Sequence, residues 1–335
     1  MQYVDARSLW VTTSTSQSDQ AGKLPVVLRA DTSQSAGTRR RAIVNEAEDD
    51  PMRVSLLITC VVDVVAPEIG EAAVRTLRAA GCTVSCDLTQ TCCGRPAWDA
   101  GFADEAAAVA RPTLAALEAE LDRGAAAVVV PSGSCAAMVQ RHWPEMFAIA
   151  GDLDAARRSR RVGDRTEEWS AFLAARADHL PDLALHRPRR LALHQHCHRP
   201  PAPTSATAVA DGPIDGLLGR VAGSDVVTWT GTDRCCGFGG AVAAAEPTEL
   251  PELAGMGDLD TLDDPDRATG PDVPVALTDE KLRALLGVDV VVGCDTACLL
   301  HLRSRAEALG TAVEIRHLAQ VIEDALPTPV AEVAP

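Results

Sequence analysis

Eight of the eleven cysteines recur in the same order in the two halves of the sequence. In each half a single cysteine comes first, a Cys-Cys-Gly triplet follows, and another single cysteine comes last. The first set is Cys60, Cys92, Cys93 and Cys135, and the second set is Cys197, Cys235, Cys236 and Cys298. Thiolates are soft ligands that suit iron–sulfur clusters or zinc, so this repeated order predicts a metal or cluster site in each half.

Each Cys-Cys-Gly triplet requires a sharp turn of the backbone. Adjacent side chains of an extended chain point to opposite faces, so both thiols reach one centre only if the chain turns. Gly94 and Gly237 directly follow the pairs and permit a positive φ at low cost. Zinc sites usually use Cys-x2–4-Cys knuckles, which neither set contains. We therefore predict one iron–sulfur cluster per half. The alternatives are zinc, and buried or disulfide-bonded cysteines without metal.

Further cysteines and histidines lie near these sets. Cys82 and Cys86 flank a predicted strand and are interpreted as buried thiols, with metal ligation as the alternative. Cys294 lies four residues before Cys298 and is a candidate ligand or redox partner. Three histidines alternate around Cys197, namely His194, His196 and His198. Because they would share one face at strand period, a zinc or substrate role is considered. The alternatives are functional protonation or hydrogen bonding to cluster sulfur, and local hydrogen bonding near a strand end.

Three other side chains follow the triplets. Arg95 is a candidate for binding an anionic carboxylate or for a surface salt bridge. Trp98 and Phe238 are predicted to pack over the sites and exclude water. The glycines at 237, 239 and 240 lack the spacing of a dinucleotide fingerprint, and a Walker motif is absent, so no nucleotide site is predicted.

Strand-like and helix-like segments alternate along the chain, which is typical of a parallel sheet covered on both faces. In the first half, strands are predicted near 54–59, 83–85 and 125–130, with helices over 68–80 and 103–123. In the second half, strands are predicted near 191–193, 226–229, 288–292 and 312–315, with a helix over 317–326. The cysteines follow these strands, at the sheet edge where ligands of open α/β sheets collect. We predict an α/β fold of two pseudo-symmetric halves, each a small parallel sheet with flanking helices.

The composition divides the chain into four parts. Residues 1–51 lack periodicity and are predicted to be a disordered N-terminal extension, with Met52 as a candidate start residue. The first cysteine-rich domain is predicted over 52–150, a linker or outer layer over 151–190, and the second cysteine-rich domain over 191–326. Residues 246–280 contain eleven Asp or Glu, five Pro and one Arg, which predicts a solvated acidic insertion in the second domain.

The overall charge and hydropathy exclude several classes of function. The 335 residues carry a formal net charge of −16, which argues against general binding of nucleic acid or anionic membranes. No uncharged apolar run approaches the roughly 18 residues of a membrane span. The start of the sequence does not resemble a secretory signal, so a cytoplasmic location is expected. In a reducing cytosol, cysteines more often bind metal or carry out redox chemistry than form structural disulfides.

Five motifs together resemble the lactate utilisation protein A family, whose members carry tandem cysteine-rich (CCG) domains. They are Thr-Cys-Val-Val-Asp at 59–63, Gln-Thr-Cys-Cys-Gly-Arg-Pro-Ala at 90–97, Pro-Ser-Gly-Ser-Cys at 131–135, Asp-Arg-Cys-Cys-Gly-Phe-Gly-Gly at 233–240 and Asp-Thr-Ala-Cys-Leu-Leu at 295–300. The wider superfamily includes the B subunit of heterodisulfide reductase and the iron–sulfur subunit of glycolate oxidase. The resemblance covers residues 52–326 and implies a [4Fe–4S] cluster in each half that relays electrons or acts on disulfides. It also implies partner subunits of the B and C types in the oxidation of L-lactate to pyruvate.

The sequence departs from the fullest form of this pattern, in which each half ends in Cys-x-x-Cys. Here Ser132 and Asp295 occupy the first of those two positions. Four cysteines per half favour a cubane or oxygen-assisted site over a five-thiolate cluster. The ferredoxin run Cys-x2-Cys-x2-Cys-x3-Cys-Pro is absent, which argues against the glycolate oxidase subunit. We predict an iron–sulfur electron-transfer subunit of an L-lactate-oxidising complex. The alternatives are a heterodisulfide reductase-like protein and a zinc- or cluster-bound structural subunit without turnover.

Overall fold

The structure is a computed structural model, and it describes residues 51–198, 212–232, 234–238 and 272–328. The described residues form two four-stranded sheets, and every strand pairing within them is parallel. No helix in these ranges is long and apolar enough to cross a membrane.

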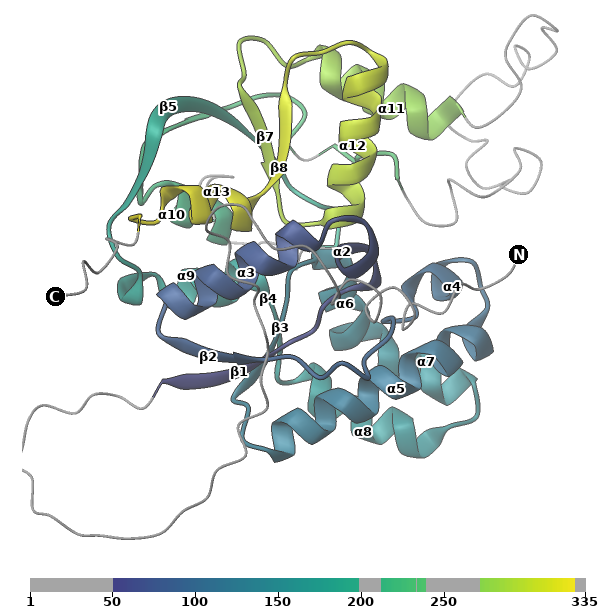
Figure 1. Cartoon of the computed structure of the whole chain (residues 1–335). Coiled ribbons are helices and arrows are strands. Elements are labelled where there is room, and N and C mark those ends of the chain that lie inside the picture. Colours follow the sequence, from purple (N-terminus) through teal and green to yellow (C-terminus); the bar gives the residue numbers. More distant parts are fainter. Residues whose placement is uncertain (1–50, 199–211, 233, 239–271, 329–335) are drawn as a thin grey trace, which may run out of the picture. The chain divides into compact units, whose positions relative to one another are not determined.

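Both sheets have the same strand order (Figure 1). The first sheet runs β2-β1-β3-β4, and the second runs β6-β5-β7-β8, so each sheet begins with its second strand. The strands are β1 (Met52–Leu56), β2 (Cys82–Ser85), β3 (Ala127–Val130), β4 (Thr166–Glu168), β5 (Leu183–His194), β6 (Val221–Val227), β7 (Val290–Gly293) and β8 (Glu314–His317). All residues of β3 and β7 are buried, as expected for central strands covered on both faces.

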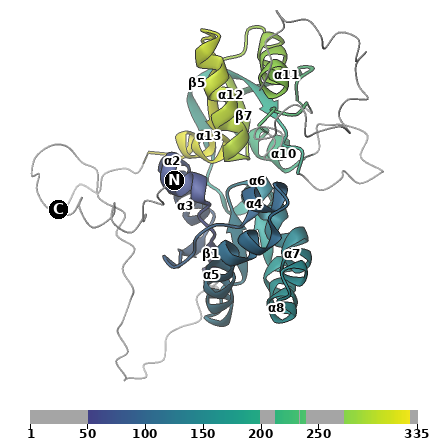
Figure 2. The ribbon, with the colours of Figure 1, turned by 90° about the vertical axis from the view of Figure 1, so that its right-hand side faces the viewer.

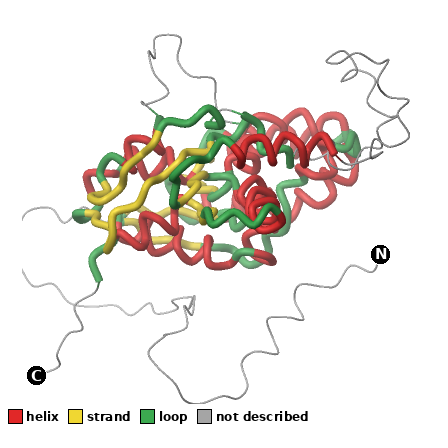
Figure 3. Tube along the Cα trace, turned by 90° about the horizontal axis from the view of Figure 1, so that it is seen from above, coloured by secondary structure: helices red, strands yellow, loops and turns green. Residues whose placement is uncertain are grey.

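Helices cover both faces of each sheet (Figure 3). Those of the first half are α2 (Cys60–Val65), α3 (Pro67–Ala79), α4 (Arg95–Asp99), α5 (Ala103–Asp122), α6 (Gly133–Ala137), α7 (Trp143–Ile149), α8 (Leu153–Gly163) and α9 (Trp169–Ala175). A π-helical turn (Met138–His142) joins α6 to α7, and a 3₁₀ turn (Ala177–His179) follows α9. Those of the second half are α10 (Pro213–Leu218), α11 (Asp272–Arg283), α12 (Thr296–Ala308) and α13 (Leu318–Ala325).

One apolar layer is shared by the two halves. It joins Val54 and Leu56 of β1 to Leu191 and Leu193 of β5, and the helices α3, α9, α10 and α13 contribute to it. Within this layer α3 packs against α13 and α9 packs against α10. The opposite faces have separate cores: α5, α7 and α8 cover the first sheet, and α11 and α12 cover the second (Figure 2). The cysteine sets lie on these outer faces.

The prediction of an α/β fold with two parallel-sheet halves is confirmed. Two local predictions differ from the structure. The segment 151–190 was expected to be a linker or outer layer, but it contains β4, the fourth strand of the first sheet, between α8 and α9. Residues 272–280 were expected in a solvated loop, but they begin α11, where Thr278 and Lys281 are fully buried. The rest of the acidic insertion and residues 1–50 of the extension lie outside the described residues.

Candidate metal centres

The four cysteines of the first set come from three loops at the carboxyl ends of β1, β2 and β3. Cys60 begins α2 and its Sγ lies 3.5 Å from that of Cys92. Cys93 is buried, and its Sγ lies 3.3 Å from that of Cys135 in α6. The structure therefore brings all four predicted residues of this half together as two pairs of neighbouring thiols. The two pairs are linked by the peptide bond between Cys92 and Cys93.

The second set repeats this arrangement at the ends of β5, β6 and β7. Cys236 and Cys298 are buried, and their sulfur atoms lie 2.9 Å apart. Cys235 neighbours Cys197, and both of these residues are exposed. All eleven cysteines carry free thiols, so the predicted alternative of a vicinal disulfide is absent from both pairs.

A left-handed glycine shapes each pair. Gly94 and Gly237 both have φ of 84°, and each donates its backbone N–H to the first sulfur of its pair, Cys92 or Cys235, at 3.4 Å. A hydrogen bond from the Cys60 thiol, supported by Cys93 and the Gly94 amide, lowers the pKa of Cys92 to about 3. A similar set of donors, led by the thiol of Cys197, lowers the pKa of Cys235 to about 2. Each pair therefore presents a thiolate at neutral pH, which is the form that binds metal.

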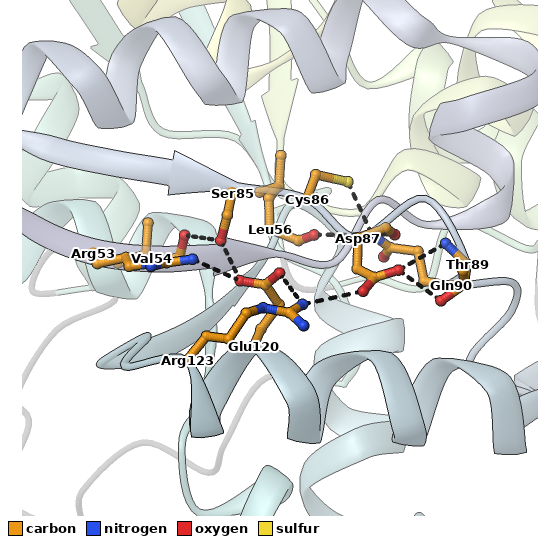
Figure 4. Close-up of polar contacts among 10 residues, drawn as sticks. All are labelled: Arg53, Val54, Leu56, Ser85, Cys86, Asp87, Thr89, Gln90, Glu120 and Arg123. Carbon is orange, nitrogen blue, oxygen red and sulfur yellow. Dashed lines mark hydrogen bonds and ion pairs between the residues drawn. The ribbon is translucent and has the colours of Figure 1, made fainter. Parts of the chain in front are cut away.

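Side chains from neighbouring helices fix the first cysteine loop. Thr113 of α5 donates its hydroxyl to the carbonyl of Cys92 at 3.2 Å. The indole N–H of buried Trp143 donates to the carbonyl of Cys93 at 2.8 Å. Gln90 donates its amide to the carbonyl of Leu56 at 3.2 Å, which ties the loop to the end of β1 (Figure 4).

A buried carboxylate anchors the start of this loop (Figure 4). Glu120 of α5 is 4% exposed and accepts a hydrogen bond from Ser85, the last residue of β2, at 2.6 Å. Arg123 bridges Glu120 at 2.5 Å and Asp87 at 3.2 Å, so one guanidinium links α5 to the loop. Cys86 lies in this cluster, where its Sγ accepts from Gln90 at 2.9 Å. Burial raises the pKa of Cys86 to about 12, so this thiol is protonated at neutral pH.

The second cysteine loop is held from α11. Thr278 donates its hydroxyl to the carbonyl of Cys236, the second cysteine of its pair, at 2.5 Å. In the first half Thr113 donates instead to the carbonyl of the first cysteine, Cys92. The ammonium of Lys281 donates to the carbonyl of Arg234 at 2.5 Å and to that of Gly231, and it lies 5.2 Å from the centroid of the Trp229 ring. Sequence analysis missed this buried lysine, because its segment has the composition of a solvated loop.

Ser132 and Asp295, the two residues at the missing cysteine positions, join the halves to each other. The Oδ2 atom of Asp295 accepts from the Ser132 hydroxyl at 3.2 Å and from the Ser134 amide at 2.7 Å. Its Oδ1 atom accepts from the amide of Cys298 at 3.2 Å. Burial alone would raise the pKa of Asp295, but nearby His196 and these hydrogen bonds lower it to about 2. The carboxylate is therefore ionised, and hydrogen-bond donors surround it. This environment suits the N-cap of α12 and a contact between the two halves better than it suits a metal ligand.

Other contacts across this junction place the two cysteine sites side by side. The amide of Gly133 donates to the carbonyl of Cys294 at 3.1 Å. The ring of His196 lies on Gly133 so closely that a Cβ there would come within 2.0 Å of it. Arg141 of the first half donates to the carbonyl of His198 at 2.5 Å. The loops that carry Cys135 and Cys197 are thus in direct contact through their neighbours.

The remaining candidates have local partners. Arg95 forms an ion pair with Asp99 at 2.8 Å, so the predicted salt bridge is present. The ring of Trp98 packs at a tilt against that of His142, with a centroid distance of 6.1 Å. Phe238, which is 42% exposed, meets the ring of His301 edge to face at the same distance. The Sγ of Cys82 lies 3.9 Å from the carbonyl of Ala80, and Cys294 is fully buried. The sequence alone did not single out His194, because the three histidines recur at the same two-residue interval.

The fold and the paired thiol groups define a cysteine-rich α/β protein, and comparison with known proteins agrees. The cysteine-rich domain family called CCG matches residues 54–140. Lactate utilization protein A of Geobacillus kaustophilus is 31% identical over 273 residues, which cover 81% of this chain and 98% of that protein. Its counterpart in Anoxybacillus flavithermus is 30% identical, with 81% and 99% covered. The chain therefore belongs to the lactate utilization protein A family.

An aspartate racemase homologue from Pyrococcus horikoshii OT3 aligns with 81% of this chain and 96% of its own, at a TM-score of 0.26 and 11% identity.

Proposed function

We propose that this protein is an iron–sulfur redox subunit that takes part in the oxidation of L-lactate to pyruvate. Cys60, Cys92, Cys93 and Cys135 would hold one cluster, and Cys197, Cys235, Cys236 and Cys298 would hold the other. One observation carries the proposal: two sheets of identical topology each gather four thiols at the same edge. The membership of the lactate utilization protein A family supports the choice of pathway.

The donor set fits such a group. Each half offers four soft sulfur ligands, one of which is held as a thiolate by a neighbouring thiol and by the glycine amide. Sulfur separations of 3.5 Å for Cys60 and Cys92 and 3.3 Å for Cys93 and Cys135 put both thiols of each pair within reach of one metal centre. A cubane cluster takes one thiolate on each of its four irons, so its binding would move these sulfur atoms further apart. When bound, an iron–sulfur cluster would accept and pass on single electrons.

Partner subunits of the B and C types complete this proposal. Oxidising a 2-hydroxy acid normally calls on a flavin, a nicotinamide or a substrate-binding cluster, and the sequence contains no dinucleotide fingerprint or ferredoxin run. The chain would therefore receive or deliver electrons through another polypeptide. Direct contact between the loops of Cys135 and Cys197 supports a short path between the two proposed clusters.

Metal analysis tests the ligand assignment. Protein purified without oxygen should contain iron and acid-labile sulfide, and little zinc. Replacing Cys92 and Cys93 together with serine should remove about half of the iron, whereas the Cys82→Ser control should keep all of it. Zinc in place of iron would favour a structural site, and unchanged iron in the double variant would refute the assignment.

A turnover assay tests the subunit role. Anaerobic protein with L-lactate and an artificial electron acceptor should show activity only when the proposed B- and C-type partners are added. Robust lactate-dependent reduction by this chain alone would move the chemistry onto its own two sites. Reduction of a small disulfide instead of lactate would favour the heterodisulfide reductase-like alternative.

A further inference from the structure

His194 lies on the face of the second sheet that carries the cysteines. It is the last residue of β5, where successive side chains point to opposite faces. Leu193 belongs to the layer shared by the halves, whereas Ala192 packs in the outer core with Cys236 and Cys298. The imidazole of His194 is therefore directed to the same side as these two buried thiols.

The three side chains form a compact group of ligand atoms. One ring nitrogen of His194 and the sulfur atoms of Cys236 and Cys298 all lie within 4.8 Å of one another. All three residues are buried, and His194 is 1% exposed. Neither ring nitrogen of His194 has a hydrogen-bond partner among the described residues. A buried imidazole with two unpaired nitrogens is unfavourable unless another group binds it.

The first half has an apolar residue at the equivalent position. Leu57 lies three residues before Cys60, as His194 lies three residues before Cys197. Leu57 is buried in the same core as Cys93, so a hydrocarbon side chain fills this place without difficulty. Packing alone therefore does not require a histidine in the second half.

We propose that His194 is a nitrogen ligand of the second metal centre, beside the thiolates of Cys236 and Cys298. This inference rests on the proposed metal-binding function, and it makes the two centres chemically different. The first centre would have sulfur ligands, while the second would combine thiolates with an imidazole. Where the neutral imidazole takes the place of one of the four anionic thiolates, the second centre would carry less negative charge than the first, so it would have the higher reduction potential and would be reduced first.

Spectroscopy of the full-length, metal-loaded protein tests the inference without any substitution. Samples with natural and ¹⁵N-labelled histidine would be reduced and compared by pulsed electron paramagnetic resonance. X-ray absorption at the iron and zinc edges would cover centres that are not paramagnetic. We expect a strong nitrogen coupling that changes with the isotope, or scattering from an imidazole ring bound to the metal.

Matched variants identify the residue. His194→Leu copies the residue of the first half and should abolish the nitrogen signal, lower the potential of the second centre and remove at most half of the metal. His194→Cys should restore the metal but not the nitrogen signal. His301→Leu, a histidine substitution in the same half, should keep both.

The outcomes separate the two proposals. Bound metal without a nitrogen signal, or a signal that persists in His194→Leu, would overturn the ligand role and leave the metal-binding function intact. Protein that binds neither iron nor zinc would overturn both. Isotope-sensitive coupling that is lost only in the His194 variants would support the mixed centre.

Discussion

Gly94 determines whether both thiols of the first pair can face one centre. Its φ of 84° is readily adopted only by glycine, and its amide donates to Cys92. A Cβ at this position would lie 2.5 Å from the backbone oxygen of Ala106 in α5. The residue therefore combines an unusual conformation with a close approach between the loop and the helix.

Replacing Gly94 with alanine should consequently cost more than the left-handed conformation alone. Gly101 provides the control, because its φ of 83° is similar but nothing lies within 4 Å of its Cβ position. We expect Gly101→Ala to lower the free energy of unfolding by about 1 kcal/mol and Gly94→Ala by at least about 2 kcal/mol. Denaturant titration and metal analysis measure both effects. Equal destabilisation of the two variants would contradict a role for the contact with α5.

Glu168 should make the stability of the protein depend on pH. It ends β4 and caps α9, with its Oε1 buried and without a hydrogen-bond partner among the described residues. Burial raises the pKa of Glu168 from 4.5 to about 7, against the hydrogen bonds from Ser170 and Ala171. A raised pKa means that the folded state holds the proton more tightly. The stabilisation is thus complete below about pH 4.5 and is lost as the pH rises through 7.

We expect the free energy of unfolding to fall by about 2 kcal/mol between pH 5.5 and 8 because of this residue. Glu168→Gln keeps an oxygen to cap α9 and should remove most of that slope. The exposed neighbour Glu167→Gln is the matched control and should leave the slope unchanged. A pH profile of Glu168→Gln that matches the unsubstituted protein would show that the proton is held elsewhere.

At the scale of elements, α11 supports the loop of the second cysteine pair. Lys281 is 0% exposed and donates to the carbonyls of Gly231 and Arg234, on the approach to Cys235. Its ammonium also lies over the ring of Trp229. This one side chain thus connects a helix to the backbone that must turn at the cysteine pair.

Lys281→Met should preserve the length of the side chain but lose these charged hydrogen bonds. Hydrogen bonds to charged groups contribute roughly 1.5–3 kcal/mol each, and buried carbonyls would lose their donor. We expect a loss of about 2–4 kcal/mol in stability and a selective loss of metal from the second half. Arg283→Met, at an exposed site on the same helix, is the control. Full metal content in Lys281→Met would argue that the loop holds its turn without α11.

The sequence allowed most elements to be predicted, because apolar runs and cysteines recur at strand ends. β4 was missed, since Thr-Glu-Glu is short and only its first residue is buried. The start of α11 was missed because its proline and acidic residues resemble the preceding insertion. The order of the cysteines in the sequence indicated which of them lie together at the end of each sheet. The special position of His194 could be recognised only from the structure, which shows the face of β5 on which it lies and the burial of its ring nitrogens.

At the scale of the whole molecule, the shared apolar layer should make the halves unfold together. Leu77 of α3 and Ile322 of α13 are both fully buried in this layer. Leu77→Ala should cost about 2–5 kcal/mol and should speed hydrogen exchange in the second sheet as well as the first. Leu114→Ala in the outer core of the first half is the matched control, with its strongest effect close to α5. Exchange that increases only in the first half for Leu77→Ala would show that the halves are independent.

The pairing of α3 with α13 and of α9 with α10 also has an evolutionary consequence. A half by itself would expose the apolar sides of its two inner helices, and a second copy related by a twofold axis is the simplest partner that covers them. A symmetric dimer, however, must carry the same residue at both equivalent positions. Joining the copies in one polypeptide removes that restriction. Leucine at 57 and histidine at 194 are a difference that a dimer of identical chains could not carry.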